Sequence, residues 1–124
     1  METMEEFVNS LASVGVLRQA RDAAVRAWGD DISITLLFAR LGRAIAEDFD
    51  ALPREEKAHV FDVIEQGMKS GNTVLSTAVA TGLLEAISAK TSEDPDLAGK
   101  IDVHLGAESK KYLIAWENWL NNSR

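Results

Sequence analysis

The feature that most constrains the fold is a stretch of the chain, Ser70–Leu84, that contains no charged side chain, although 27% of all residues are charged. From this stretch to Lys90, apolar or small residues recur at the i, i+3, i+4, i+7 spacing of one helical face: Leu75, Ala78, Val79, Gly82, Leu83, Ala86 and Ile87. The opposite face carries only hydroxyls, at Thr73, Thr77, Thr81 and Ser88. A helix without a strongly polar face is normally covered on most sides, so the sequence predicts a central buried helix over about residues 73–89.

Length and composition indicate one self-sufficient domain. A chain of 124 residues is the size of a single domain and buries about two thirds of its unfolded surface. It has no cysteine, which excludes a disulfide scaffold, a thiolate metal site and a cysteine nucleophile. No apolar run approaches the ~20 residues that span a bilayer, and the acidic start Met1–Glu6 is unlike a signal peptide. We therefore expect a cytoplasmic protein that does not associate with membranes.

The rest of the chain also has helical spacing. Apolar positions repeat every three or four residues in the segments 4–28, 34–49, 60–68, 97–101 and 107–121. Gly15 interrupts the first segment, which is either one kinked helix or two. Asp30–Asp31 and Asp94 are predicted N-caps, and Pro53 is predicted to open a helix.

These elements together predict the architecture. The β-branched run 32–35 could begin a strand, but no partner strand is visible, which favours a helix. Loops are short and no internal repeat occurs, as is typical of antiparallel neighbouring helices. We predict an all-α compact bundle of five to seven helices around the central apolar helix, in a single domain spanning residues 1–124.

The sequence carries little catalytic chemistry. It has neither the Gly-x-Ser-x-Gly elbow of hydrolases nor a glycine-rich phosphate loop. Glu56 and His59 have the Glu-x-x-His spacing of di-iron bundles, but the second such pair is missing at His104. We therefore expect no catalytic residue, no cofactor and no metal, with His59 exposed and bonded to Glu55 or Asp62.

Two features allow more than one interpretation. Glu85, the only acid within the central helix, is either a buried functional carboxylate or a structural one that pairs with an arginine or reaches solvent; the structural interpretation is favoured. Tyr112, Trp116 and Trp119 lie on one broad face of the last helix and form either a ligand or partner surface or part of the core. Their helical spacing favours the core.

The charge balance bears on the kind of partner. A net charge of −7 argues against nonspecific nucleic-acid binding, but it suits either a basic protein partner or solubility alone. Acids gather in two clusters: Glu47, Asp48 and Asp50, and Glu93, Asp94 and Asp96. The second cluster has a structural explanation in helix capping and the helix dipole. The first opposes the dipole of the helix that it ends, so it ranks ahead as a predicted partner-binding site.

Two segments resemble a known family. Thr77-Ala-Val-Ala-Thr-Gly-Leu-Leu-Glu85 resembles a "v-a-t-G-[FL]-L-E" helix, and Leu105-Gly-Ala-Glu-Ser-Lys-Lys-Tyr-Leu-Ile-Ala-Trp116 resembles an "L-G-p-x-s-[RK]-x-Y-x-x-x-W" segment. Both patterns are those of a family of small acidic all-helical immunity proteins from bacterial polymorphic and contact-dependent toxin systems. Ala107 stands where proline is frequent in that family; either residue can start a helix. The span from Thr77 to Trp116, which contains both segments, is about a third of the chain.

The resemblance implies a function. Such immunity proteins bind a cognate toxin domain and block its active site or its access to substrate, without catalysis or cofactor. The acidity of this chain suits a basic toxin such as a nuclease. The alternative is a helical adaptor or regulatory protein that self-associates through the Tyr112/Trp116/Trp119 face. A small ligand-binding or metal protein that uses His59 is the weakest hypothesis.

Overall fold

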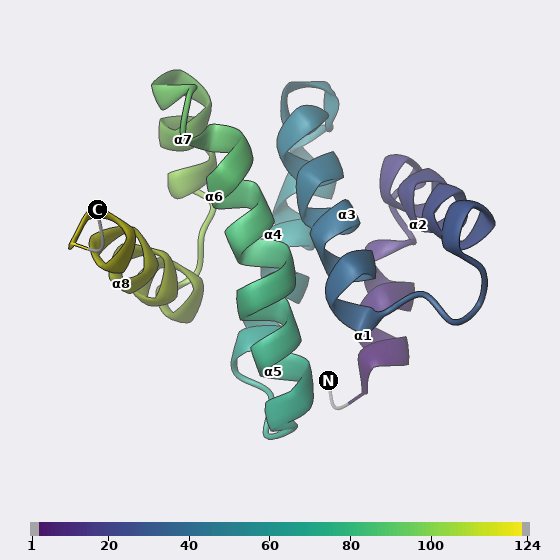
Figure 1. Cartoon of the computed structure of the whole chain (residues 1–124). Helices are drawn as coiled ribbons and strands as arrows, with labels where there is room; N and C mark the ends of the chain where they lie inside the picture. Colours follow the sequence, from purple (N-terminus) through teal and green to yellow (C-terminus); the bar gives the residue numbers. More distant parts are fainter. Residues whose placement is uncertain (1–2, 123–124) are drawn as a thin grey trace.

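The computed structural model describes residues 3–122, and every regular element in that range is helical. The elements in chain order are α1 (Met4–Leu11), α2 (Gly15–Trp28), α3 (Ile34–Glu47), the 3-10 turn η1 (Phe49–Ala51), α4 (Arg54–Met68), α5 (Thr73–Ala78), η2 (Val79–Leu84), α6 (Glu85–Thr91), α7 (Pro95–Asp102) and α8 (Ala107–Asn122) (Figure 1). Because α5, η2 and α6 are continuous, these residues form seven helices besides the η1 turn. The predicted all-α bundle of five to seven helices is confirmed.

The continuous helix α5–η2–α6 is the predicted central helix. Leu75, Val79 and Leu83 are fully buried, with 0% exposure. The hydroxyl face differs from the expectation over part of its length, because Thr73, Thr77 and Thr81 are exposed while Ser88 is buried. The Thr81 hydroxyl donates a 2.8 Å hydrogen bond to the Thr77 carbonyl oxygen. This hydroxyl is therefore satisfied within its own helix and needs no partner from another one.

The middle of this helix is π-helical over Val79–Leu84, which the apolar spacing did not predict. Here the central helix lies very close to α3. A Cβ atom on Gly82 would lie 2.9 Å from Phe38 Cβ, and one on Gly42 would lie 2.3 Å from the Leu83 carbonyl oxygen. The two glycines therefore allow a separation between the helices that no larger residue permits.

The helix boundaries settle several predictions. The helix is interrupted at residues 12–14, so the first segment forms two helices, α1 and α2. The N-cap of α3 is Ser33, whose hydroxyl accepts a 3.1 Å hydrogen bond from Leu36 N, and the prediction of Asp30–Asp31 was wrong. Ser33 is the extended residue directly before α3, which places its hydroxyl within reach of the free N–H groups of the first turn, whereas Asp30 and Asp31 lie earlier, in a turn. Asp94 is confirmed as the N-cap of α7, with a 3.1 Å bond from the N–H three residues on.

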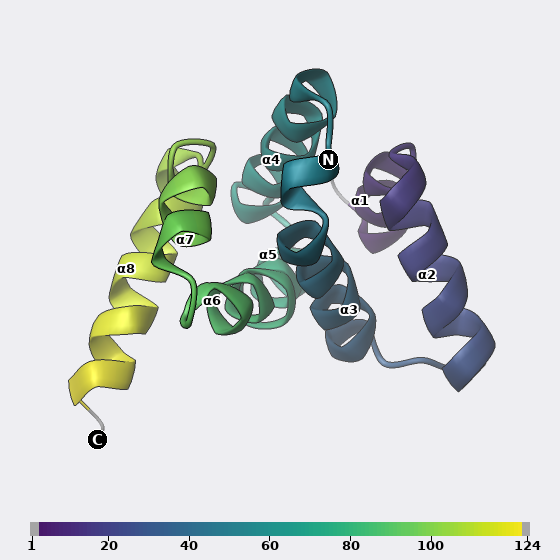
Figure 2. The same ribbon diagram turned by 90° about the horizontal axis from the view of Figure 1, so that it is seen from above.

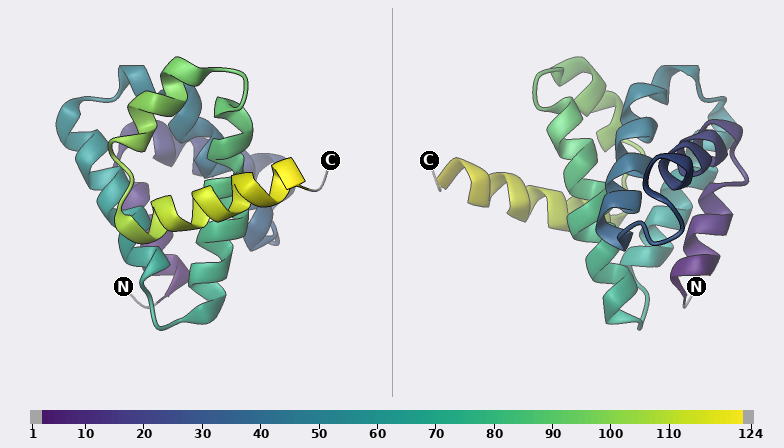
Figure 3. Two further views of the ribbon diagram at one scale, coloured as in Figure 1. Left: turned by 90° about the vertical axis from the view of Figure 1, so that its left-hand side faces the viewer. Right: turned by 45° about the vertical axis from the view of Figure 1, so that its right-hand side comes forward.

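The helices lie side by side across the molecule. Viewed from above, α1 and α2 lie on one side of α3, while α7 and α8 lie on the far side of the central helix (Figure 2). Phe38 of α3 stacks on Phe7 of α1 with ring centroids 5.1 Å apart. Figure 3 shows α8 crossing the central helix and extending beyond the body of the molecule at its C-terminal end. Much of the outer half of α8 is therefore open to solvent.

Candidate partner-binding surface

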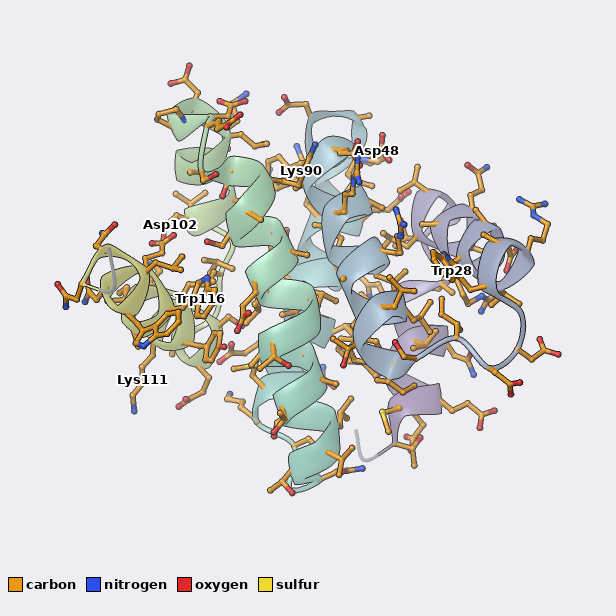
Figure 4. The ribbon with its side chains drawn as sticks, viewed as in Figure 1. Trp28, Asp48, Lys90, Asp102, Lys111 and Trp116 are labelled. Carbon is orange, nitrogen blue, oxygen red and sulfur yellow. The ribbon has the colours of Figure 1, made fainter. Side chains whose placement is uncertain are left out.

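The two acidic clusters come together at one end of the molecule. All six predicted residues, Glu47, Asp48, Asp50, Glu93, Asp94 and Asp96, are exposed. Glu47 ends α3 and Asp50 lies in η1, whereas Glu93 and Asp94 lead into α7. Lysines from the helices on either side of the second cluster pair with the first: Lys90 Nζ lies 3.9 Å from Glu47 Oε2, and Lys100 Nζ lies 3.2 Å from Asp50 Oδ1. Figure 4 shows Asp48 and Lys90 at this shared end.

Two acids of the first cluster, Glu47 and Asp50, form ion pairs that were not predicted from the sequence. Besides Lys90, Glu47 pairs with Arg43 on its own helix, at 2.9 Å between Nε and Oε1. No structural role was predicted for this cluster, whereas Glu47 and Asp50 both have cationic partners in the structure. The Arg43–Glu47 pair has the i, i+4 spacing of one helix, but Lys90 and Lys100 come from α6 and α7, which sequence spacing could not place beside the end of α3. Asp48 forms no ion pair with any residue in the range 3–122.

These ion pairs leave the surface negative. All lie in solvent, where side-chain exposure runs from 40% for Lys90 to 70% for Asp50, so each contributes little to stability. Six carboxylates face three cations, Arg43, Lys90 and Lys100. An acidic surface carried by helix ends and connections can contact a partner without disturbing the core.

The histidines are held by structural contacts. Nε2 of His59 lies 2.8 Å from the Ser10 carbonyl oxygen and 3.2 Å from Ser13 Oγ, so the predicted bond to Glu55 or Asp62 was wrong. The break between α1 and α2 brings this chain segment beside α4. His104 stacks on Phe61, with ring centroids 5.6 Å apart. Across the residues that the structure describes, no group of three or more potential metal ligands occurs.

Glu85 has a structural partner that the sequence did not predict. The Tyr112 hydroxyl donates a short hydrogen bond to Glu85 Oε2, which links α8 to the central helix. Within residues 3–122, Glu85 forms no ion pair with an arginine and bonds to this tyrosine instead. Burial and the hydrogen bond to this carboxylate both raise the pKa of the Tyr112 phenol. The two segments that carry the family resemblance meet at this bond, so part of their pattern serves to dock α8.

Glu65 on α4 caps α8 from another helix, and sequence reasoning missed it. Its carboxylate accepts hydrogen bonds from Glu108 N at 2.8 Å, from Ser109 N at 3.0 Å and from Ser109 Oγ at 2.8 Å. Burial acts to raise the pKa of Glu65, but these bonds prevail and hold it below its usual value. A Cβ atom on Gly106 would lie 2.4 Å from Glu65 Cδ, so this glycine makes room for the cap.

One signal in the sequence could have indicated this contact. Glu65 follows Phe61 by four residues and so borders the apolar stripe of α4, where a carboxylate needs a donor. The donors are N–H groups at the start of α8, more than 40 residues away in the chain. Spacing within one helix cannot identify them.

The aromatic face of α8 is only partly core. Leu113 is buried and Tyr112 and Trp116 are half-buried, but Trp119 is 58% exposed. The Trp116 and Trp119 rings stack with centroids 5.2 Å apart. The prediction that this face is core was therefore wrong for Trp119, because α8 extends past the helix that it crosses (Figure 3).

The comparisons with known proteins identify a family but no activity. Within residues 3–122, no helix is long and apolar enough to cross a bilayer. Neither a curated protein nor a solved structure matches the chain. Residues 6–121 match the family described as "Domain of unknown function (DUF7674)", and because this match covers nearly the whole chain, the protein belongs to that family.

Proposed function

We propose that the protein is a cytoplasmic bacterial immunity protein. It binds a cognate toxin domain and blocks the toxin's active site or its access to substrate, without catalysis or a cofactor of its own. The observation that carries the proposal is the convergence of Glu47, Asp48 and Asp50 with Glu93, Asp94 and Asp96 on one exposed end. The family resemblance of the segments ending at Glu85 and Trp116 supports the same function.

Electrostatics favours a basic toxin such as a nuclease. The net charge of −7 gives the protein a negative field, and the acidic end concentrates it. Complementary charge accelerates the encounter of two proteins and excludes partners of like charge. Because the acidic residues are exposed, a partner can contact them while the helices keep their packing.

The test uses a toxin domain, which we expect to be encoded beside the gene for this protein. Co-expression of the two proteins should rescue bacterial growth that the toxin alone arrests. The variant Glu47→Lys/Asp50→Lys should then slow association by about tenfold at low salt and reduce its salt dependence. The variant Asp30→Lys/Asp31→Lys is the matched control, because it changes the net charge equally in the exposed α2–α3 connection.

Two outcomes would count against the proposal. Growth arrest that co-expression does not relieve contradicts the immunity function. Equal association rates for the two charge-reversal variants, both well folded, remove the acidic end from the interface. Circular dichroism checks folding, since the loss of the exposed Arg43, Lys90 and Lys100 pairs costs at most about 1 kcal/mol each.

A second candidate function rests on the aromatic face of α8. A tryptophan that is 58% exposed and stacked on its neighbour is a typical anchor of a protein interface. A helical adaptor that self-associates through Tyr112, Trp116 and Trp119 should sediment as a dimer, and Trp119→Ala should return it to a monomer. A wild-type protein that stays monomeric at high concentration contradicts self-association through this face.

A further inference from the structure

A cleft of about 300 Å³ opens between α6, α7 and α8. Its walls are mostly apolar and include Ile87, Ile101, Leu105, Leu113 and Ile114. Ile114 is 55% exposed, although it borders this hollow. Ile87, Ile101 and Leu113 are buried, so the apolar surface that the cleft leaves open comes from Ile114 and the partly exposed Leu105.

Polar groups stand on two sides of the cleft. Asp102 of α7 and Glu117 of α8 both line it, together with Lys110. Lys110 Nζ lies 3.6 Å from Asp102 Oδ2, and Figure 4 shows Asp102 between α7 and α8. Glu117 forms no ion pair with any residue that the structure describes. The cleft thus holds one carboxylate more than its cation can compensate.

A buried hydroxyl lies next to Glu117. The Ser88 hydroxyl, only 7% exposed, donates a 3.5 Å hydrogen bond to Glu117 Oε2. Thr91, which is 8% exposed, also lines the cleft and donates its hydroxyl to the Ser88 carbonyl oxygen. Hydroxyls behind an uncompensated carboxylate form a polar site beside the apolar wall.

We propose that this cleft receives an arginine side chain from the basic partner; the inference rests on the proposed function. An arginine places its aliphatic stem along apolar surface and its charged head at a polar edge. Its planar guanidinium offers several donors, which suits carboxylates that stand on two neighbouring helices. A volume near 300 Å³ is at the lower limit of small-molecule pockets and fits a single inserted side chain.

The position of the cleft agrees with this occupant. It lies along α7, whose first residues adjoin Glu93 and Asp94 and whose Lys100 contacts Asp50 of the other acidic cluster. A basic partner held at the acidic end therefore lies next to the cleft. Buried arginines dominate the binding energy of many protein interfaces. The cleft therefore strengthens binding, whereas the acidic end accelerates the encounter of the two proteins.

The first test needs no toxin. Butylguanidinium, which copies the arginine side chain, is titrated into ¹⁵N-labelled protein, and amide shifts are followed by NMR. Saturable shifts are expected at Ser88, Gly99, Asp102 and Glu117, with none from butylurea, a neutral analogue of the same shape. Glu117→Gln should weaken binding by about tenfold or more, because a charge-assisted bond is lost. Glu108→Gln, an exposed change elsewhere on α8, should leave binding unchanged.

The inference fails if butylurea shifts the same amides equally, or if butylguanidinium produces no saturable shift up to its solubility limit. It also fails if the shifts gather at Asp48 and Glu93 instead of the cleft. Failure here leaves the proposed function standing where Glu47→Lys/Asp50→Lys still slows toxin association. Growth arrest that co-expression does not relieve would overturn the function itself, whatever butylguanidinium does.

Discussion

Removal of the Glu65 carboxylate should weaken the attachment of α8. In Glu65→Ala, the N–H groups of Glu108 and Ser109 and the Ser109 hydroxyl all lose their acceptor. Ser109 is only 1% exposed, so water cannot readily replace the carboxylate there. A hydrogen bond to a charged group contributes about 1.5–3 kcal/mol, and three donors that share one acceptor do not add fully. We expect a loss of about 2–3 kcal/mol in the free energy of unfolding.

Urea denaturation followed by circular dichroism measures this loss. Glu55→Ala is the control on the same helix, because Glu55 is exposed and such surface changes cost less than about 0.5 kcal/mol. Glu65→Gln keeps the shape of the side chain and should lose less than Glu65→Ala, since one amide oxygen still accepts. A Glu65→Ala protein as stable as the Glu55→Ala control would refute the capping role.

The pH dependence of the free energy of unfolding also tests the Glu65 cap. The pKa of Glu65 is lower in the folded protein than in the unfolded chain. Its contribution is therefore complete above the unfolded value of about 4.3 and is lost as the pH falls through the folded value. The stability difference between wild type and Glu65→Gln should be constant near neutral pH and shrink below about pH 4.3. A difference that stays constant into acid would contradict the charged cap.

Three further predictions concern the core and the second α8 contact. Leu83→Ala should cost about 2–5 kcal/mol in urea denaturation, because the side chain is fully buried, and a loss below about 0.5 kcal/mol would place it at the surface. Gly42→Ala should lower the melting temperature far more than Gly71→Ala, which has open space around it; equal shifts would contradict the close helix contact. Burial and the bond to Glu85 raise the pKa of Tyr112, the only tyrosine, in the folded protein. The contribution of the protonated phenol to the free energy of unfolding is therefore complete below the unfolded pKa of about 10 and is lost as the pH rises through the folded pKa. The absorbance of phenolate should thus appear at higher pH in folded than in unfolded protein, and coincident titrations would contradict the bond.

The helices, and the central position of one of them, followed from the amino-acid pattern alone. An uncharged stretch with apolar residues every three or four positions has few ways to avoid water except as a buried helix, and Leu75, Val79 and Leu83 are buried accordingly. The N-cap at Asp94 could also be predicted, because a cap and its N–H partner lie only three residues apart. It was misread at Ser33, where several polar residues precede the helix and only one has the required backbone geometry.

Which distant groups meet could not be predicted from the pattern and depends on how the helices pack. Glu65 with Ser109, Glu85 with Tyr112, and Lys100 with Asp50 are each separated by more than 25 residues. The exposure of Trp119 was likewise undecided by the sequence, since helical spacing gives the face of a residue but not how far the neighbouring helix extends. Periodicity reports on a single helix, whereas caps, ion pairs and clefts depend on the angles and separations at which helices pack, and those follow from the whole core.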